Sequence, residues 1–81
     1  MKKNRDAMER IVVNPKVMGG KPVVKGTRVT VEQILRLMAQ GLSVDEILMD
    51  YPHLCREDVS AVLLYAAKLA DEEEVYPIPA T

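Results

Sequence analysis

The sequence predicts a mainly α-helical fold, with a small N-terminal β-hairpin and a three-helix, helix-turn-helix core. Three observations predict it. Short β-branched runs interrupted by glycine and proline fill residues 11–29, apolar residues at helical spacing fill residues 31–71, and capping sequences open the helices. A chain of 81 residues has room for one domain. Because Phe and Trp are absent, aliphatic side chains must build the core.

The N-terminal part is expected to be a flexible arm followed by a small β unit. Residues 1–10 are polar and lysine-rich, which is typical of a flexible arm. Residues 11–13 form a β-branched run that a turn signal closes. Val23-Val24 and Arg28-Val29 flank Gly26, and a glycine in so short a connection predicts a hairpin at this point.

Two capping boxes, at Thr30 and Ser43, open the first two helices. The first helix is expected over residues 31–40, and Gly41 supplies its left-handed end. The second helix is expected to last about two turns before Pro52 ends it.

The third helix is expected to start at Cys55 or Arg56 and to run to about Asp71, which completes a single domain over residues 11–71. Its main apolar stripe is predicted to contain Val59, Val62, Leu63, Ala66 and Ala70. A second apolar face carries Ala61, Leu64 and Tyr65. This face is interpreted as a homodimer interface, and the alternative is a wide core face in a domain without Phe or Trp.

Charge is unevenly distributed along the chain. Residues 1–36 hold nine basic and three acidic side chains, and residues 37–81 hold two basic and nine acidic ones. The halves therefore carry 9 − 3 = +6 and 2 − 9 = −7. This polarity indicates one acidic and one basic partner, or halves that attract each other within the fold or across a dimer.

No constellation for catalysis or metal binding is expected. One Cys and one His are too few for a structural zinc site, and the chain is expected to need no cofactor. His53 and Cys55 lie two residues apart around a turn, so a Cys–His nucleophile has no geometric support. The single Cys and the lack of long apolar runs or a signal-peptide pattern indicate a cytoplasmic protein that does not enter a membrane.

Duplex DNA is a plausible ligand of the basic half. The helix that follows the turn of a helix-turn-helix usually enters the major groove, but here it would present Arg56, Glu57 and Asp58, whose net charge is negative. The β unit is the better candidate because phosphates attract its cations. The predicted DNA-binding residues are Lys16, Lys21, Lys25 and Arg28. The alternative is that these side chains form an ordinary solvated face.

Residues 72–81 form an acidic stem followed by an apolar tip with two prolines. Such a segment is suited to binding a basic partner surface, with the acids steering association and the apolar side chains as anchors. The predicted partner-binding residues are Glu72, Glu73, Glu74, Val75, Tyr76 and Ile78. The alternative is a frayed terminus.

Residues 10–70 resemble a family of small bacterial and archaeal proteins known as domain of unknown function four-three-three and described as VapB-like antitoxins. The motifs that carry the resemblance are Gly19-Gly20-Lys21-Pro22, Gly26-Thr27-Arg28, Gly41-Leu42-Ser43 and Tyr51-Pro52-His53-Leu54. The resemblance implies a homeodomain-like fold and pairing with a PIN-like ribonuclease toxin, which the antitoxin binds and silences. The chain departs from the family at Cys55, where Ser or Thr usually caps the helix, and the thiol is expected to cost roughly 0.5–2 kcal/mol.

The expected function is that of an antitoxin-like binding protein, a homodimer that neutralises a PIN-like toxin and has operator DNA as a second ligand. It is expected to be no enzyme and to have no small-molecule substrate. The alternative is a stand-alone DNA-binding transcriptional regulator. A third and weaker reading is a thiol enzyme that uses Cys55.

Overall fold

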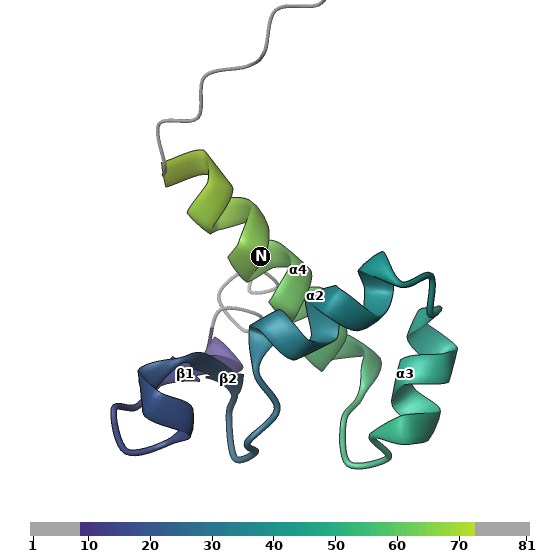
Figure 1. The fold of residues 1–81 in the computed structure, drawn as a ribbon, viewed down its shortest axis with the longest axis horizontal. Coiled ribbons are helices and arrows are strands. Elements are labelled where there is room, and N and C mark those ends of the chain that lie inside the picture. The colour runs from purple at the N-terminus through teal and green to yellow at the C-terminus, as the bar shows by residue number, and fades with distance from the viewer. Residues whose placement is uncertain (1–8, 73–81) are drawn as a thin grey trace, which may run out of the picture.

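The computed structural model describes residues 9–72, which form a three-helix core with a two-stranded antiparallel sheet beside it (Figure 1). The second and third of these helices are joined by a short turn, as the predicted helix-turn-helix core requires. The elements in chain order are β1 Ile11–Val13, the 3-10 turn η1 Met18–Gly20, β2 Pro22–Val24, α2 Val31–Ala39, α3 Val44–Asp50 and α4 Arg56–Glu72.

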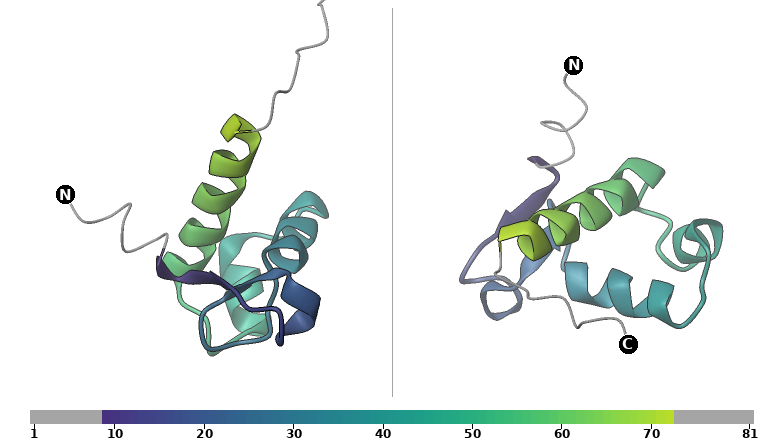
Figure 2. Two further views of the ribbon diagram at one scale, coloured as in Figure 1. Left: turned by 90° about the vertical axis from the view of Figure 1, so that its left-hand side faces the viewer. Right: turned by 90° about the horizontal axis from the view of Figure 1, so that it is seen from above.

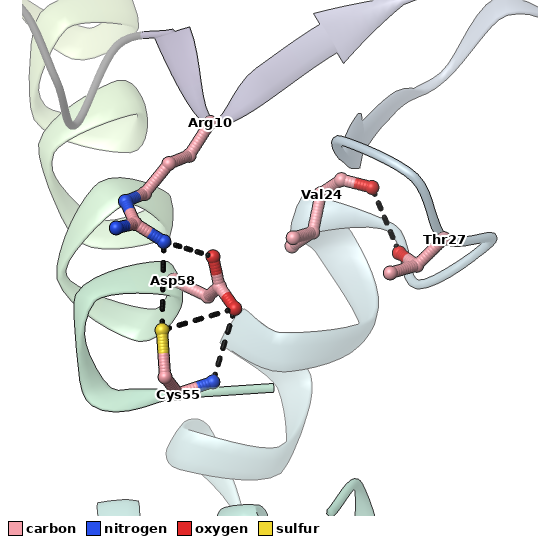
Figure 3. A network of polar contacts seen from close by, with 5 residues as sticks. All are labelled: Arg10, Val24, Thr27, Cys55 and Asp58. Carbon is pink, nitrogen blue, oxygen red and sulfur yellow. Dashed lines mark hydrogen bonds and ion pairs between the residues drawn. The ribbon is translucent and has the colours of Figure 1, made fainter. Parts of the chain in front are cut away.

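The N-terminal β-hairpin is confirmed, but its longer ladder lies between β1 and β2, and the pairing predicted across Gly26 is present only in short form. β1 pairs with β2, with Ile11 opposite Val24, across a connection that contains η1. At the predicted hairpin the chain makes only a tight turn and one isolated bridge. The Thr27 hydroxyl explains this: it donates to the Val24 carbonyl oxygen at 2.8 Å (Figure 3) and accepts from the Val29 N–H at 3.0 Å. A side chain that bonds to the backbone on both sides competes with a longer strand ladder.

The caps of α2 and α3 confirm the expected helix starts and correct one detail. The Thr30 hydroxyl accepts from the Gln33 N–H at 3.0 Å, but the Gln33 side chain donates to the Tyr51 hydroxyl instead of returning to Thr30. The box at Ser43 is complete, because the Glu46 carboxylate accepts from the Ser43 N–H at 2.7 Å. Gly41 follows α2 with a φ of 99°, the left-handed conformation expected of a helix stop.

The core lies between α2, α3 and α4, with β1 and β2 closing one side (Figure 2). Its most buried side chains are aliphatic, as the composition requires. Ile34, Ile47, Val59, Ala61 and Val62 are each no more than 2% exposed.

The buried face of α4 is rotated by about a quarter turn from the predicted stripe. Ala61, predicted to lie at a dimer interface, is completely buried within the single chain and therefore cannot contact a second one. Leu63 and Ala70, predicted to be core, are exposed. The rotation arises because Asp58 turns inward to meet Arg10, which brings the neighbouring face of the helix against β1.

The last turns of α4 extend beyond the other elements (Figures 1 and 2). Leu69 lies on the same side of α4 as the buried residues but is 42% exposed. Arg10, at the end of the expected arm, is part of the fold, because its carbonyl oxygen accepts from the Lys25 N–H at 2.7 Å. Within residues 9–72, no helix is long and apolar enough to cross a membrane. Residues 1–8 of the arm and residues 73–81 of the tail lie outside the described residues.

Candidate functional site

Three side chains from opposite ends of the domain form a polar cluster where β1 meets α4 (Figure 3). The Arg10 guanidinium donates to Asp58 Oδ1 at 2.9 Å and to Cys55 Sγ at 3.4 Å. The other carboxylate oxygen, Oδ2, accepts from the Cys55 N–H at 3.0 Å and from its thiol at 3.4 Å. The Asp58 side chain is only 12% exposed and the Arg10 side chain is 38% exposed, so the carboxylate of this ion pair is shielded from solvent more than the guanidinium.

The cluster determines the charge state of Asp58. Burial opposes its ionisation, but the hydrogen bonds from the Cys55 N–H and from Arg10 outweigh burial and lower the pKa of the Asp58 carboxyl below its ordinary value. The hydrogen bond to Asp58 also raises the pKa of Arg10. Asp58 therefore stays ionised at neutral pH and holds the first turn of α4 against β1.

The same cluster changes the interpretation of Cys55. Although a thiol is a weak cap, the Asp58 carboxylate supplies the other half of a capping box by accepting from the Cys55 N–H. The Sγ atom lies between Arg10 and Asp58, whereas the His53 ring packs edge-on to Tyr51 with centroids 6.3 Å apart. Cys55 and His53 thus have different neighbours, and the thiol has a structural role at the start of α4.

The four predicted DNA-binding residues do not gather into one patch. Lys21 pairs with Glu32 on α2 at 3.2 Å, and this carboxylate also holds Arg36 at 2.7 Å. Lys25 borders a shallow hollow beside Arg10 and Asp58. Lys16 is exposed in the connection between β1 and β2.

Arg28, the fourth of these residues, lies in a groove that sequence reasoning missed. We call it the Arg28 groove. Its floor is formed by Val12, Val17, Val23 and Val29, and its polar lining includes Asn14, Thr27, Arg28, Gln33, Tyr51 and His53. The Gln33–Tyr51 hydrogen bond joins α2 to the end of α3 beside this groove. The arrangement is suited to a ligand with a negative group near Arg28 and an apolar part on the valines.

Two of the sequence motifs meet at the Arg28 groove. Gly26-Thr27-Arg28 comes from the turn after β2, and Tyr51 and His53 come from the turn between α3 and α4. Sequence reasoning treated His53 as a plain loop residue because nothing in the linear pattern places it beside Arg28. The one signal in the sequence was that both motifs are among those that carry the resemblance to the family.

The first turn of α4 carries little positive charge, as expected from the sequence. Arg56 forms an ion pair with Asp45 of α3, so its guanidinium is already engaged. Glu57 is exposed beside it, and Asp58 is paired with Arg10. If DNA is a ligand, this helix end is poorly suited to a phosphate-lined groove.

A third surface lies between α2 and the end of α4, and we call it the α2–α4 groove. It is almost entirely apolar and includes Leu35 of α2, Tyr65 and Leu69 of α4, and Pro22 of β2. Tyr65 and Leu64, both predicted at a dimer interface, are half-buried. Among residues 9–72, no group of His, Cys, Asp and Glu is placed to hold a metal ion.

Two uncharacterized proteins are similar to this chain in sequence. A protein from Sinorhizobium fredii, described as uncharacterized protein y4eO, is 38% identical over 60 residues, which are 74% of this chain and 27% of that protein. An uncharacterized protein of Archaeoglobus fulgidus is 60% identical over 30 residues, which are 37% of this chain and 83% of that one. The chain thus spans about a quarter of the Sinorhizobium relative's length.

A solved structure has the same fold as this chain. The crystal structure of a DUF433 member protein from Anabaena variabilis superposes on this chain with a TM-score of 0.74 at 29% sequence identity. The superposition covers 84% of this chain and 67% of the Anabaena chain. The sequence pattern of the family described as protein of unknown function (DUF433) matches residues 11–66, which is more than half of the chain. This chain therefore belongs to the DUF433 family.

Proposed function

We propose that this protein is an antitoxin-like binding protein, which uses the end of α4 and the tail that follows it to bind and silence a PIN-like ribonuclease toxin in the cytoplasm. One observation carries the proposal. The last turns of α4 extend beyond the core with Leu69 exposed, and they lead directly into the acidic and apolar residues 72–78. An apolar helix end that continues into such a segment is suited to a protein partner.

The distribution of charge supports a nuclease as that partner. A ribonuclease must attract a polyanion, so the rim of its active site is expected to be basic. Asp71 is exposed at the end of α4, and Glu72, Glu73 and Glu74 follow it. Four acids at a helix C-terminus oppose the helix dipole, so a basic partner surface is a reason for them to be there.

A homodimer forms part of the proposal, with a changed interface. Ala61 is excluded because it is buried in the core of one chain. Leu64 and Tyr65 are half-buried, and of the two only Leu64 lies outside the lining of the α2–α4 groove, so Leu64 remains available to a second copy.

The test is affinity purification of the full chain from its native cell, followed by binding kinetics with the captured nuclease. A PIN-like nuclease in stoichiometric amount is the expected result, and its absence would contradict the proposal. Reversing the charge of Glu73 and Glu74 should mainly slow association, and Tyr76→Ala should mainly speed dissociation. Asp50→Lys, an exposed acid at the end of α3, is the charge control and should change neither rate.

A second candidate function, a stand-alone DNA-binding regulator, is favoured by the Arg28 groove. Arg28 is exposed and no acidic residue lines the groove with it, whereas Lys21 and Arg56 are paired with carboxylates. If duplex DNA binds, Arg28→Ala should weaken it more than Arg56→Ala in a gel-shift titration. The reverse order would indicate that α4 docks in the major groove.

A further inference from the structure

The α2–α4 groove is an apolar surface that the described residues leave open to solvent. Leu69 is 42% exposed there although it lies on the core side of α4, because the helix continues past the end of the core. Tyr65 and Leu35 form the middle of the groove and are half-buried. Together these side chains present a continuous apolar surface on which a second apolar segment can be buried.

We propose that residues 75–79 of the same chain fold back and occupy the α2–α4 groove. This segment reads Val75-Tyr76-Pro77-Ile78-Pro79. The two prolines favour an extended backbone and lack N–H groups, so the segment brings few unsatisfied donors into a groove with almost no polar lining. Tyr76 and Ile78 alternate with the two prolines, so the segment carries two large side chains within three residues.

The linker from Glu72 to Tyr76 is long enough to bring the apolar tip of the tail to the α2–α4 groove. Leu69 lies one turn before α4 ends at Glu72, so the tail begins beside the groove. Four extended residues from Glu72 to Tyr76 reach about 13 Å. The groove follows α2 from Val31 to Ala39, a rise of about 12 Å. The chain can therefore turn back after Glu72 and lay its apolar tip along α2.

The rim of the groove is complementary in charge to the acidic stem. Glu32 and Arg36 line the groove, and Lys21 pairs with Glu32 from outside it, so this ion-pair cluster has one net positive charge, with the Lys21 and Arg36 side chains 59% and 73% exposed. Glu73 and Glu74 would pass close to it as the chain turns. Pairing across this rim also relieves the repulsion between the acids at the end of α4.

The tether favours the chain's own tail over a second copy. A segment held by a short linker has an effective concentration of about a millimolar, which exceeds that of another molecule in dilute solution. The inference holds whatever the identity of the external partner. Its consequence is that any partner that uses Tyr76 and Ile78 must first displace them from the groove.

The test is NMR of the full-length protein over a tenfold range of concentration. We expect nuclear Overhauser contacts from Tyr76 and Ile78 to Leu35 and Leu69, with chemical shifts that do not change with concentration. Tail signals at random-coil positions would overturn the proposal. So would contacts that appear only as concentration rises, because a second copy would then supply the tail.

A pair of matched variants isolates the groove from the rest of α4. Leu69→Ser removes a groove side chain, and Leu63→Ser removes an equally exposed leucine on another face of the same helix. Neither residue is in the core, so both variants should fold. Leu69→Ser should abolish the tail contacts and return Tyr76 to its random-coil shift, and Leu63→Ser should retain them. Equal behaviour of the two variants would refute the assignment.

Discussion

Removal of the Asp58 carboxylate should destabilise the protein more than removal of any exposed acid. Asp58→Ala breaks the ion pair with Arg10 and leaves the Cys55 N–H at the start of α4 without its acceptor. Hydrogen bonds to charged groups contribute about 1.5–3 kcal/mol each. Because the Arg10 side of the cluster is partly exposed to solvent, we expect the total loss of stability for both bonds to lie within that same range. In a domain of this size the loss corresponds to a fall in Tm of roughly 6–24 °C.

The contribution of the Asp58 carboxylate to the unfolding free energy should decrease as the pH falls. Because the folded state lowers the pKa of Asp58, the ionised carboxylate stabilises the fold at every pH above the unfolded-state pKa of about 3.9. That contribution is lost as the pH falls through the lower folded-state pKa. The difference in unfolding free energy between the wild-type protein and Asp58→Asn should therefore be full at pH 6 and should shrink towards pH 2.

Urea denaturation followed by circular dichroism at 222 nm measures the effect at both pH values. Asp50→Ala is the matched control, because Asp50 is exposed at the end of α3. Asp58→Asn should be less harmful than Asp58→Ala, since its amide oxygen can still accept from the Cys55 N–H. If Asp58→Ala were as stable as Asp50→Ala at pH 6, the Arg10–Asp58 cluster would not hold β1 to α4.

Three further predictions concern single positions. Cys55→Ser should raise the unfolding free energy by no more than about 1 kcal/mol in the same urea assay, because Asp58 already supplies half of the capping box and the hydroxyl improves the other half. Leu64→Glu should convert the proposed dimer to a monomer in light scattering, and a wild-type protein that is monomeric at micromolar concentration would contradict the proposed interface. Gly41→Ala should cost about 1 kcal/mol in thermal unfolding, because its φ of 99° strains any side chain although nothing lies within 4 Å of the added Cβ.

Local sequence signals predicted the helices of this protein well, because each helix boundary depends on residues close in sequence. Thr30 and Ser43 cap their own helices, and Gly41 ends α2. The partner of β1 could not be found in the same way. β2 has a neighbour on each edge, β1 on one and the segment after Gly26 on the other, and the two bonds of the Thr27 side chain keep the second pairing to one bridge.

The orientation of α4 shows a second limit of the linear pattern. Leucine and alanine occur all around this helix, so periodicity alone permits several buried faces. The choice is made by Asp58, a charged residue that a sequence pattern places on the solvent side. Its burial depends on Arg10, 48 positions earlier in the chain, and only the folded structure brings the two together.

Gln33 illustrates how the Arg28 groove is built at the expense of a local bond. Its side chain could complete the capping box at Thr30, which sequence reasoning expected, but it donates to the Tyr51 hydroxyl instead. The Tyr51 ring is thereby fixed beside His53, and both side chains face the turn that carries Arg28. The Thr30 half of the cap, which is worth about 1 kcal/mol, is retained. Gln33 therefore leaves out only the return bond of the capping box, and the bond that it makes instead joins two distant motifs at the groove.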